Sequence, residues 1–306
     1  MHNSIAHRFA NNPPHGLGPW KQQITLTLNF HHVLNQIMNI NYRYLTVALA
    51  LLLPALASAH DTWIQTNSPI VRTSEVVHVD LRLGNHGNQH RDFKLAGLLT
   101  LDWTTLDHVE PDGTRADLKP QLYTSASAEK QGYWTTPVTL SQSGVHQFVQ
   151  KLDRVMNHGK SIRSIRTAKS YVLASDSLDA PKIDGHAHET PAGLPFEIVL
   201  NTCPFGEVCA GHPITVTVLH HGKPIQDAVV SFIPEGETLQ GEMDPNYEFV
   251  TDASGSATFI PKKATRYLIA AHHTAMDEKT EEFEFTSYAT TIVLPVPNRP
   301  ATPLNR

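Results

Sequence analysis

Cysteine is almost absent from this sequence, with two residues among 306, which excludes a framework of several disulfides as the main source of stability. No apolar run after position 60 approaches the roughly 18 residues that indicate a membrane-spanning helix. The sequence also lacks G-x-S-x-G, H-E-x-x-H and a glycine-rich phosphate loop, which are signatures of common enzyme classes. We therefore expect a binding protein, not an enzyme, and no membrane span after position 60.

Acidic residues are missing from the first 59 positions. In this part, Arg43 precedes the run Leu45–Leu56, which is apolar except for one threonine and one proline and is too short to span a bilayer. The small-x-small sequence Ala57-Ser58-Ala59 follows directly. Together these features are typical of a secretory signal peptide. The alternative, a buried core helix, fits the length and the flanks less well.

The expected cleavage after Ala59 defines the mature chain as residues 60–306. A compact signal peptide would begin at Met38 and cover residues 38–59. We interpret residues 1–37, which are polar and have no apolar period, as an upstream extension. The protein is therefore expected to be exported to the periplasm.

The mature chain is acidic and rich in histidine. Residues 1–59 hold three basic and no acidic residues, so the remainder has 21 basic and 29 acidic residues and a net charge of −8. This charge argues against a nucleic acid or an anionic membrane surface as a partner. The leader removes five histidines and leaves 14 of the 19, a composition that favours transition-metal binding.

The two cysteines, Cys203 and Cys209, lie on either side of a turn marked by Pro204 and Gly206. In an oxidising compartment the simplest interpretation is a local disulfide that closes this loop. The alternative is a pair of thiolate metal ligands, but the spacing is wider than the usual C-x2–4-C of zinc sites. We expect the disulfide.

Short runs of alternating apolar and polar residues dominate the mature chain, which is typical of β-strands. The clearest run, near residue 80, places four apolar side chains on one face (Val77, Val79, Leu81 and Leu83) and three polar ones on the other (His78, Asp80 and Arg82). The expected fold class is therefore all-β, with two β-sandwich domains of immunoglobulin-like or transthyretin-like type.

A polar stretch rich in Asp, Ala, Pro and Gly at residues 176–194 is the best candidate for a linker between these domains. It separates an N-terminal sandwich, expected over residues 60–175, from a C-terminal sandwich, expected over residues 195–296. The tail at 297–306 is expected to be flexible.

The C-terminal half carries the pattern GxPxxxAxVxFxP…TDxxGxAxF…YxIxA, which resembles transthyretin-like and collagen-adhesin-type sandwiches. The matching residues are Gly222, Pro224, Ala228, Val230, Phe232, Pro234, Thr251, Asp252, Gly255, Ala257, Phe259, Tyr267, Ile269 and Ala271. The pattern consists of turn glycines and alternating apolar residues, so it indicates a fold and no particular chemistry.

Cleavage after Ala59 would make His60 the first residue of the mature protein. An N-terminal histidine offers two nitrogens, the free α-amine and its ring, which can chelate one ion. A second histidine ring would complete a T-shaped site with three nitrogens, known as a histidine brace. Amine and imidazole ligands suit copper, nickel and zinc.

The candidates to complete a site with His60 are His86, His90, His158 and His272. His86 and His90 lie in a Gly- and Asn-rich loop directly after the strong strand, where ligands are commonly held. His272 and His273 end the run YLIAA, and alternation sends them to opposite faces; we favour His272 as the one that points toward the first domain. His158, in another turn, is a reserve candidate.

The remaining histidines of the mature chain are given no firm role. His186 and His188 could capture metal loosely, but solvated linker residues are the simpler interpretation. His220 and His221 are expected to be exposed at a hairpin turn. Four others lack a nearby ligand set in the sequence: His78, His108, His146 and His212.

The segments AHDTWIQ, LRLGNHG, TAKSYV and YLIAAHH resemble a periplasmic family of unknown-function domains, DUF4198, whose NikK-like members are encoded beside nickel and cobalt uptake systems. The family's mature start, His-Asp-x-Trp, and its Gly-His element match His60-Asp61-Thr62-Trp63 and, with one additional Asn, Gly84-Asn85-His86. The resemblance implies nickel or cobalt binding for uptake or delivery, with a membrane permease as the natural partner protein.

The sequence is also compatible with two other functions. A copper-dependent oxygenase could be built on the same histidine brace, although no aromatic platform for a polysaccharide is evident. A structural or adhesive sandwich with incidental histidines is the third hypothesis. Nickel is the favoured ion through the resemblance, while the residues themselves also allow cobalt, copper or zinc.

Overall fold

The computed structural model describes residues 61–84, 99–125, 132–157, 159–183, 187–241 and 243–301. The chain divides into two compact units, Met1–Ala57 and Ser58–Arg306, and every described residue belongs to the second. Within the described ranges, no helix combines the length and the apolar character that crossing a membrane requires.

The regular secondary structure of the described part of the chain is almost entirely β-strand, which confirms the expected all-β class. Its helical elements are two short 3-10 turns, η1 (Leu101–Trp103) and η2 (Lys119–Gln121). The strands form three sheets of four, four and nine strands. Two of these sheets are small and each belongs to one half of the chain.

The first small sheet has the order β1-β3-β7-β6. Its strands are β1 (Asp61–Thr66), β3 (Val76–Gly84), β7 (Trp134–Thr139) and β6 (Tyr123–Thr124). The second has the order β10-β11-β12, and β15 pairs with β11. Its strands are β10 (Phe196–Leu200), β11 (Ile214–His220), β12 (Lys223–Pro224) and β15 (Ser256–Phe259).

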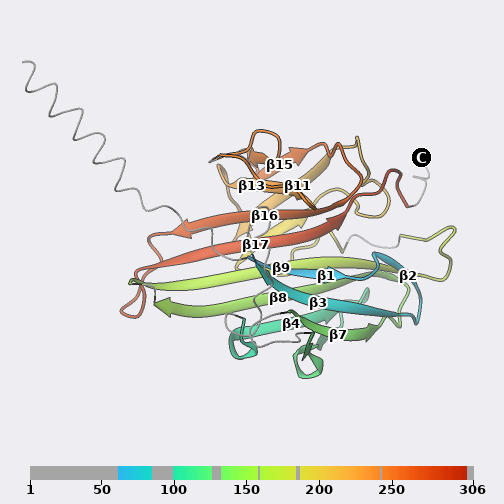
Figure 1. Cartoon of the computed structure of the whole chain (residues 1–306), viewed down its shortest axis with the longest axis horizontal. Coiled ribbons are helices and arrows are strands. Elements are labelled where there is room, and N and C mark those ends of the chain that lie inside the picture. Colours follow the sequence, from blue (N-terminus) through green and yellow to red (C-terminus); the bar gives the residue numbers. More distant parts are fainter. Residues whose placement is uncertain are drawn as a thin grey trace, which may run out of the picture. The chain divides into compact units, whose positions relative to one another are not determined.

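The nine-stranded sheet has the order β14-β13-β16-β17-β9-β8-β4-β5, and β2 pairs with β9. Figure 1 shows β16, β17, β9, β8 and β4 following one another across this sheet. The strands are β14 (Glu248–Val250), β13 (Val229–Pro234), β16 (Arg266–Ala275), β17 (Phe285–Pro295), β9 (Ser161–Ser175), β8 (Gly144–Asn157), β4 (Thr104–Val109), β5 (Arg115–Asp117) and β2 (Ile70–Arg72).

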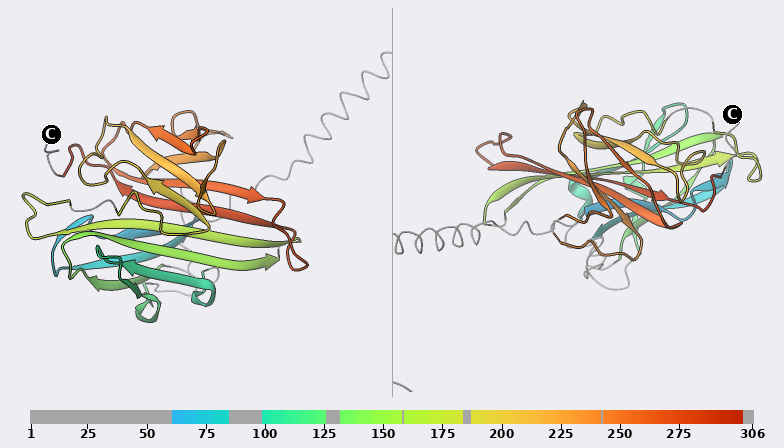
Figure 2. Two further views of the ribbon diagram at one scale, coloured as in Figure 1. Left: turned by 180° about the vertical axis from the view of Figure 1, so that it is seen from behind. Right: turned by 90° about the horizontal axis from the view of Figure 1, so that it is seen from above.

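The nine-stranded sheet joins the two halves of the chain through β17 and β9. These strands pair in parallel, from Phe285 opposite Ile162 to Ile292 opposite Lys169. The views in Figure 2 show the long strands of both halves lying side by side in this sheet. The expected linker, 176–194, contains no strand in its described part, so the halves are separate along the chain but share one sheet.

The side chains of β9 alternate between two hydrophobic cores, because successive residues of a strand point to opposite faces. Tyr171 and Leu173 belong to a core shared with the β10-β11 sheet. Val172 and Ala174 belong to a core shared with the β1-β3 sheet. The two small sheets therefore cover opposite faces of the large sheet, and β9 is buried along most of its length.

The alternation predicted near residue 80 is confirmed by β3. Its four apolar side chains are buried in the second core: Val77, Val79, Leu81 and Leu83. On the other face His78 is exposed, whereas Asp80 and Arg82 are half-buried and form an ion pair with Nη2 2.7 Å from Oδ2. β3 pairs with β1 in antiparallel register, and this pairing places Asp61, the first residue of β1, opposite Gly84, the last residue of β3.

The predicted disulfide is not formed: Cys203 and Cys209 are both free thiols. Hydrogen bonds close the turn instead: the backbone N–H groups of Glu207 and Val208 both donate to the Cys203 carbonyl at 3.1 Å. The Glu207 carboxylate accepts from the Cys203 N–H at 2.8 Å. Cys209 is buried while Cys203 is partly exposed.

Candidate functional site

The start of β1 meets β16 from the other half of the chain at Asp61 and His272. On β1, Asp61 pairs with Gly84, the last residue of β3. On β16, His272 follows the buried residues 267–271, among which Leu268 packs against Trp63 of β1. The prediction that His272 points toward the first domain is thereby confirmed.

A hydrogen bond fixes the orientation of the His272 ring. Nε2 of His272 lies 2.9 Å from Oδ1 of Asp61. A carboxylate can only accept, so Nε2 carries the proton and Nδ1 is the unprotonated nitrogen of the neutral ring. Asp61 is buried, whereas half of the His272 side chain, 51%, is exposed. The Asp61 carboxylate raises the pKa of His272.

A second cation lies behind this pair. Arg166 of β9 is buried, and its Nη1 donates to the carbonyls of Ile165 at 3.2 Å and Ser287 at 3.0 Å. Burial lowers the pKa of Arg166, and attraction to Asp61 opposes that effect. Asp61 thus lies between the His272 ring and the field of a buried guanidinium.

The other predicted ligands, His60, His86, His90 and His158, lie outside the described residues. Two of them are close in sequence to described residues that pair with each other. His60 precedes Asp61, and His86 follows Gly84 by two positions, with Asp61 opposite Gly84 in the β1–β3 ladder. Their part in a metal site stays a prediction.

A second cluster of histidines lies on the opposite face of β16, in the C-terminal half. His220 ends β11, His221 follows it in the turn, and Glu278 lies in the connection between β16 and β17. One donor atom from each of these three residues lies within 4.8 Å of the others. His273 points to this face, and its ring centroid is 4.8 Å from that of His220.

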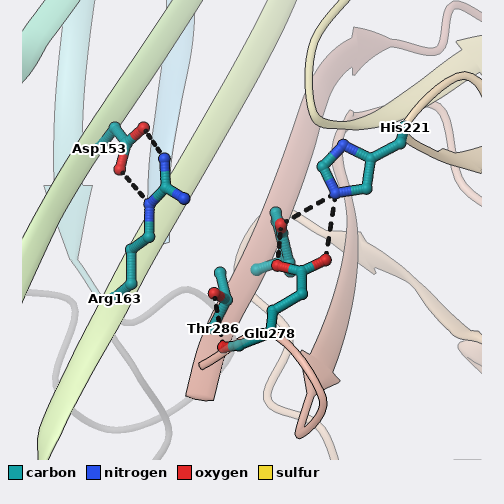
Figure 3. A network of polar contacts seen from close by, with 6 residues as sticks. Asp153, Arg163, His221, Glu278 and Thr286 are labelled. Atoms are coloured by element: carbon teal, nitrogen blue, oxygen red, sulfur yellow. Dashed lines mark hydrogen bonds and ion pairs between the residues drawn. The ribbon is translucent and has the colours of Figure 1, made fainter. Parts of the chain in front are cut away.

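Hydrogen bonds organise the second cluster around Glu278 (Figure 3). The His221 Nε2–H donates to Oε1 of Glu278 at 3.1 Å, and the Tyr288 hydroxyl donates to Oε2 at 2.5 Å. Burial alone would raise the pKa of Glu278, but these hydrogen bonds outweigh it, and the pKa lies below its usual value. Burial and the neighbouring histidines lower the pKa of His220.

Two expectations about the histidines outside the predicted site are wrong. His220 was expected to be exposed, but its side chain is only 21% exposed. His188 was expected to be a solvated linker residue, but it is buried. His108 and His146, which lack sequence neighbours that suggest a role, form a buried pair with Nε2 of His108 2.9 Å from Nδ1 of His146.

The sequence signal for the second cluster is limited to the adjacent His220 and His221, because Glu278 is remote in the chain.

The family model of DUF4198, a domain of unknown function, matches residues 57–275 of this chain. The match covers more than half of the sequence and includes both Asp61 and His272, so the chain belongs to the DUF4198 family. The family part of the resemblance is thus confirmed. The association with nickel and the transthyretin-like type of the C-terminal sandwich stay predictions.

No curated protein matches the chain. Solved structures to which it is similar include the D0-D1 domain of intimin, with 15% identity, 77% of this chain and 98% of that chain covered, and a TM-score of 0.21. A DUF4785 family protein from Legionella pneumophila is 12% identical; the match covers 68% of this chain and 51% of that chain, with a TM-score of 0.24. The Yersinia pseudotuberculosis adhesin InvE is also 12% identical; the match covers 78% of this chain and 59% of that chain, with a TM-score of 0.20. Similarity at this level carries no argument about function.

Proposed function

We propose that this protein is an exported metal-binding protein that carries nickel or cobalt for uptake, with its site at the beginning of β1. The observation that carries the proposal is the hydrogen bond between His272 and Asp61. Asp61 is the residue directly after His60, the expected amino terminus. Export, cleavage after Ala59 and delivery to a membrane permease are parts of this proposal.

The Asp61–His272 pair has the arrangement that metal-binding histidines usually show. A ligating histidine commonly donates its other ring N–H to a carboxylate, which fixes the tautomer and makes the ligating nitrogen more basic. Here Nε2–H donates to Asp61, so Nδ1 is the nitrogen available to an ion. Half of the His272 side chain is exposed, which leaves access from solvent.

We expect the other proposed ligands near this nitrogen because they are close in the chain to Asp61 and Gly84, which lie opposite each other. Consecutive Cα atoms are about 3.8 Å apart, so the amine and ring of His60 start one residue from the Asp61 carboxylate. Gly84 lies opposite Asp61, and His86 follows it by two positions. The proposed site consists of the His60 amine and ring and the His272 ring, with His86 as a further ligand.

The donor set determines the class of ion. Imidazole and amine nitrogens favour nickel, cobalt, copper and zinc over calcium or magnesium, which prefer oxygen. Nickel or cobalt is the proposed cargo because of the resemblance to the NikK-like members of the family. The protein acts in this proposal by binding and releasing the ion, and no chemical step is assigned to it.

Calorimetry with Ni²⁺ on the chain that begins at His60 tests the proposal. We expect saturable binding that weakens by at least about tenfold when one residue is added before His60 or when His272 is replaced by alanine. Asp61→Asn should weaken binding less than His272→Ala, because it removes only the orienting carboxylate.

The matched control is His78→Ala, which removes an exposed histidine from β3 and should leave the affinity unchanged. Equal affinity for the native and the extended amino terminus would contradict the role of the amine. No saturable binding of nickel, cobalt, copper or zinc would leave the structural sandwich as the better hypothesis.

A further inference from the structure

We infer that His220, His221 and Glu278 form a second binding site for a divalent transition-metal ion, separate from the site of the proposed function. The site lies between the β10-β11 sheet and the β16–β17 connection, on the opposite side of the large sheet from Asp61 and His272. It requires no residue from outside the described part of the chain.

The distances between the donor atoms fit a metal ion of the zinc type. Two ligands that each lie 2.0–2.1 Å from a tetrahedral ion are about 3.3 Å apart. Oε1 of Glu278 lies 3.3 Å from Nε2 of His220 and 3.1 Å from Nε2 of His221. The ligand atoms of the three residues all lie within 4.8 Å of one another. One ion can therefore contact both rings and this carboxylate oxygen once the side chains adjust and the ion displaces the Nε2 proton of His221.

The local structure holds these donors in place before an ion binds. His221 has a φ of 50° and Gly222 a φ of 75°, the two positive values of a type I′ hairpin turn. This turn directs the His221 ring toward Glu278, as Figure 3 shows. The Tyr288 hydroxyl holds the other carboxylate oxygen at 2.5 Å, so Oε1 stays directed at the histidines.

A buried nitrogen without a hydrogen bond also favours an ion at this position. Nε2 of His220 is buried and makes no hydrogen bond to any described residue, although Oε1 of Glu278 lies 3.3 Å away. A metal ion held between the two side chains would satisfy this nitrogen.

Arg163, a cation in the surroundings of the site, is paired with another carboxylate. Nε and Nη2 of Arg163 are bound to the two oxygens of Asp153 at 2.9 and 2.8 Å. Figure 3 shows this pair on one side and the His221–Glu278 contact on the other. The direct partner of the guanidinium is therefore Asp153, and the two hydrogen bonds of this pair hold it there.

An ion at this position would connect two sheets. His220 belongs to the β10-β11 sheet, and Glu278 belongs to the connection between two strands of the large sheet. Because a ligand that binds only the folded state stabilises it, Zn²⁺ should raise the unfolding temperature. The class of ligand is a borderline ion with two nitrogens and one carboxylate oxygen from the protein, and water at the fourth position.

The test measures Zn²⁺ binding and thermal unfolding on the full chain in a His272→Ala background, which removes a ligand of the first site. We expect one bound Zn²⁺ and a higher unfolding temperature. His220→Ala combined with His221→Ala should weaken binding by at least tenfold and abolish the temperature shift. His212→Ala, which removes an exposed histidine of the same half, is the matched control and should change neither.

Glu278→Gln keeps the size of the side chain and removes its charge, and it tests the site if the double histidine variant does not fold. Unchanged Zn²⁺ affinity and temperature shift in either variant would overturn the inference. The two proposals fail separately. Loss of binding on extension of the amino terminus concerns only His60 and His272, whereas loss in the Glu278 variant concerns only the second site.

Discussion

Nζ of Lys169 lies 2.6 Å from Oε1 of Glu197, and both side chains are 1% exposed. Lys169 is on β9 and Glu197 is on β10, so this buried ion pair connects the large sheet to the C-terminal small sheet. Glu197 also accepts hydrogen bonds from the backbone N–H groups that end the linker: those of Ala192, Gly193 and Leu194. One carboxylate thus neutralises a buried cation and fixes the chain where it enters the second half.

We predict that Glu197→Gln destabilises the protein by about 3–5 kcal/mol, because it leaves a buried ammonium group without its counter-charge. Urea unfolding measures the loss. Lys160 and Glu284 form an ion pair that is exposed on the surface, so Glu284→Gln is the control and should cost less than about 1 kcal/mol. A cost for Glu197→Gln as small as that of the control would contradict this view of the pair.

We predict that stability falls as the pH drops from 6.5 to about 4, because of His108. Burial and the neighbouring His146 ring lower the pKa of His108 from 6.5 to about 4. Between these values the unfolded chain binds a proton that the folded chain does not, so the contribution is complete above pH 6.5 and is lost as the pH falls. The size of the effect is on the order of 3 kcal/mol.

The measurement is the free energy of unfolding at several pH values, for the natural chain and for His108→Phe. The aromatic replacement keeps the stacking on Phe148 and removes the titrating group. Other groups titrate in both proteins, so the difference between the two curves isolates His108. Parallel curves between pH 4 and 6.5 would show that His108 does not take part.

We predict that Gly255→Ala destabilises the protein more than Gly211→Ala. Both glycines have positive φ values, +74° and +85°, which cost an alanine about 1–2 kcal/mol. At Gly255 a Cβ would also lie 2.8 Å from Cβ of Pro224, whereas at Gly211 nothing lies within 4 Å. The extra overlap should add about 1–3 kcal/mol, measured by thermal or urea unfolding, and equal losses would contradict it.

The strands and the faces of their side chains could be predicted because they depend on local alternation. The alternation of neighbouring residues along a strand predicts that Val77 is buried and His78 exposed. It also predicts that His272 and His273 point to opposite faces. Alternation cannot show which strands pair. The parallel contact between β17 and β9, and with it the shared sheet, was therefore not predicted.

The second histidine cluster was missed for a related reason. His220 and His221 looked like exposed turn residues because a hairpin turn alone carries no information on what covers it. Glu278 and Tyr288 come from another part of the chain and are brought there by the pairing of β16 with β17. Polar contacts between distant strands, such as Lys169 with Glu197, have no sequence spacing that could reveal them.

The parallel pairing of β17 with β9 also affects how the chain acquires its structure. A ribosome makes β9 well before β17, so the growing polypeptide exposes an unpaired edge of β9 until the last strands emerge. Such late, long-range pairing slows folding. A fragment that stops before residue 285 would retain that open edge and would tend to aggregate.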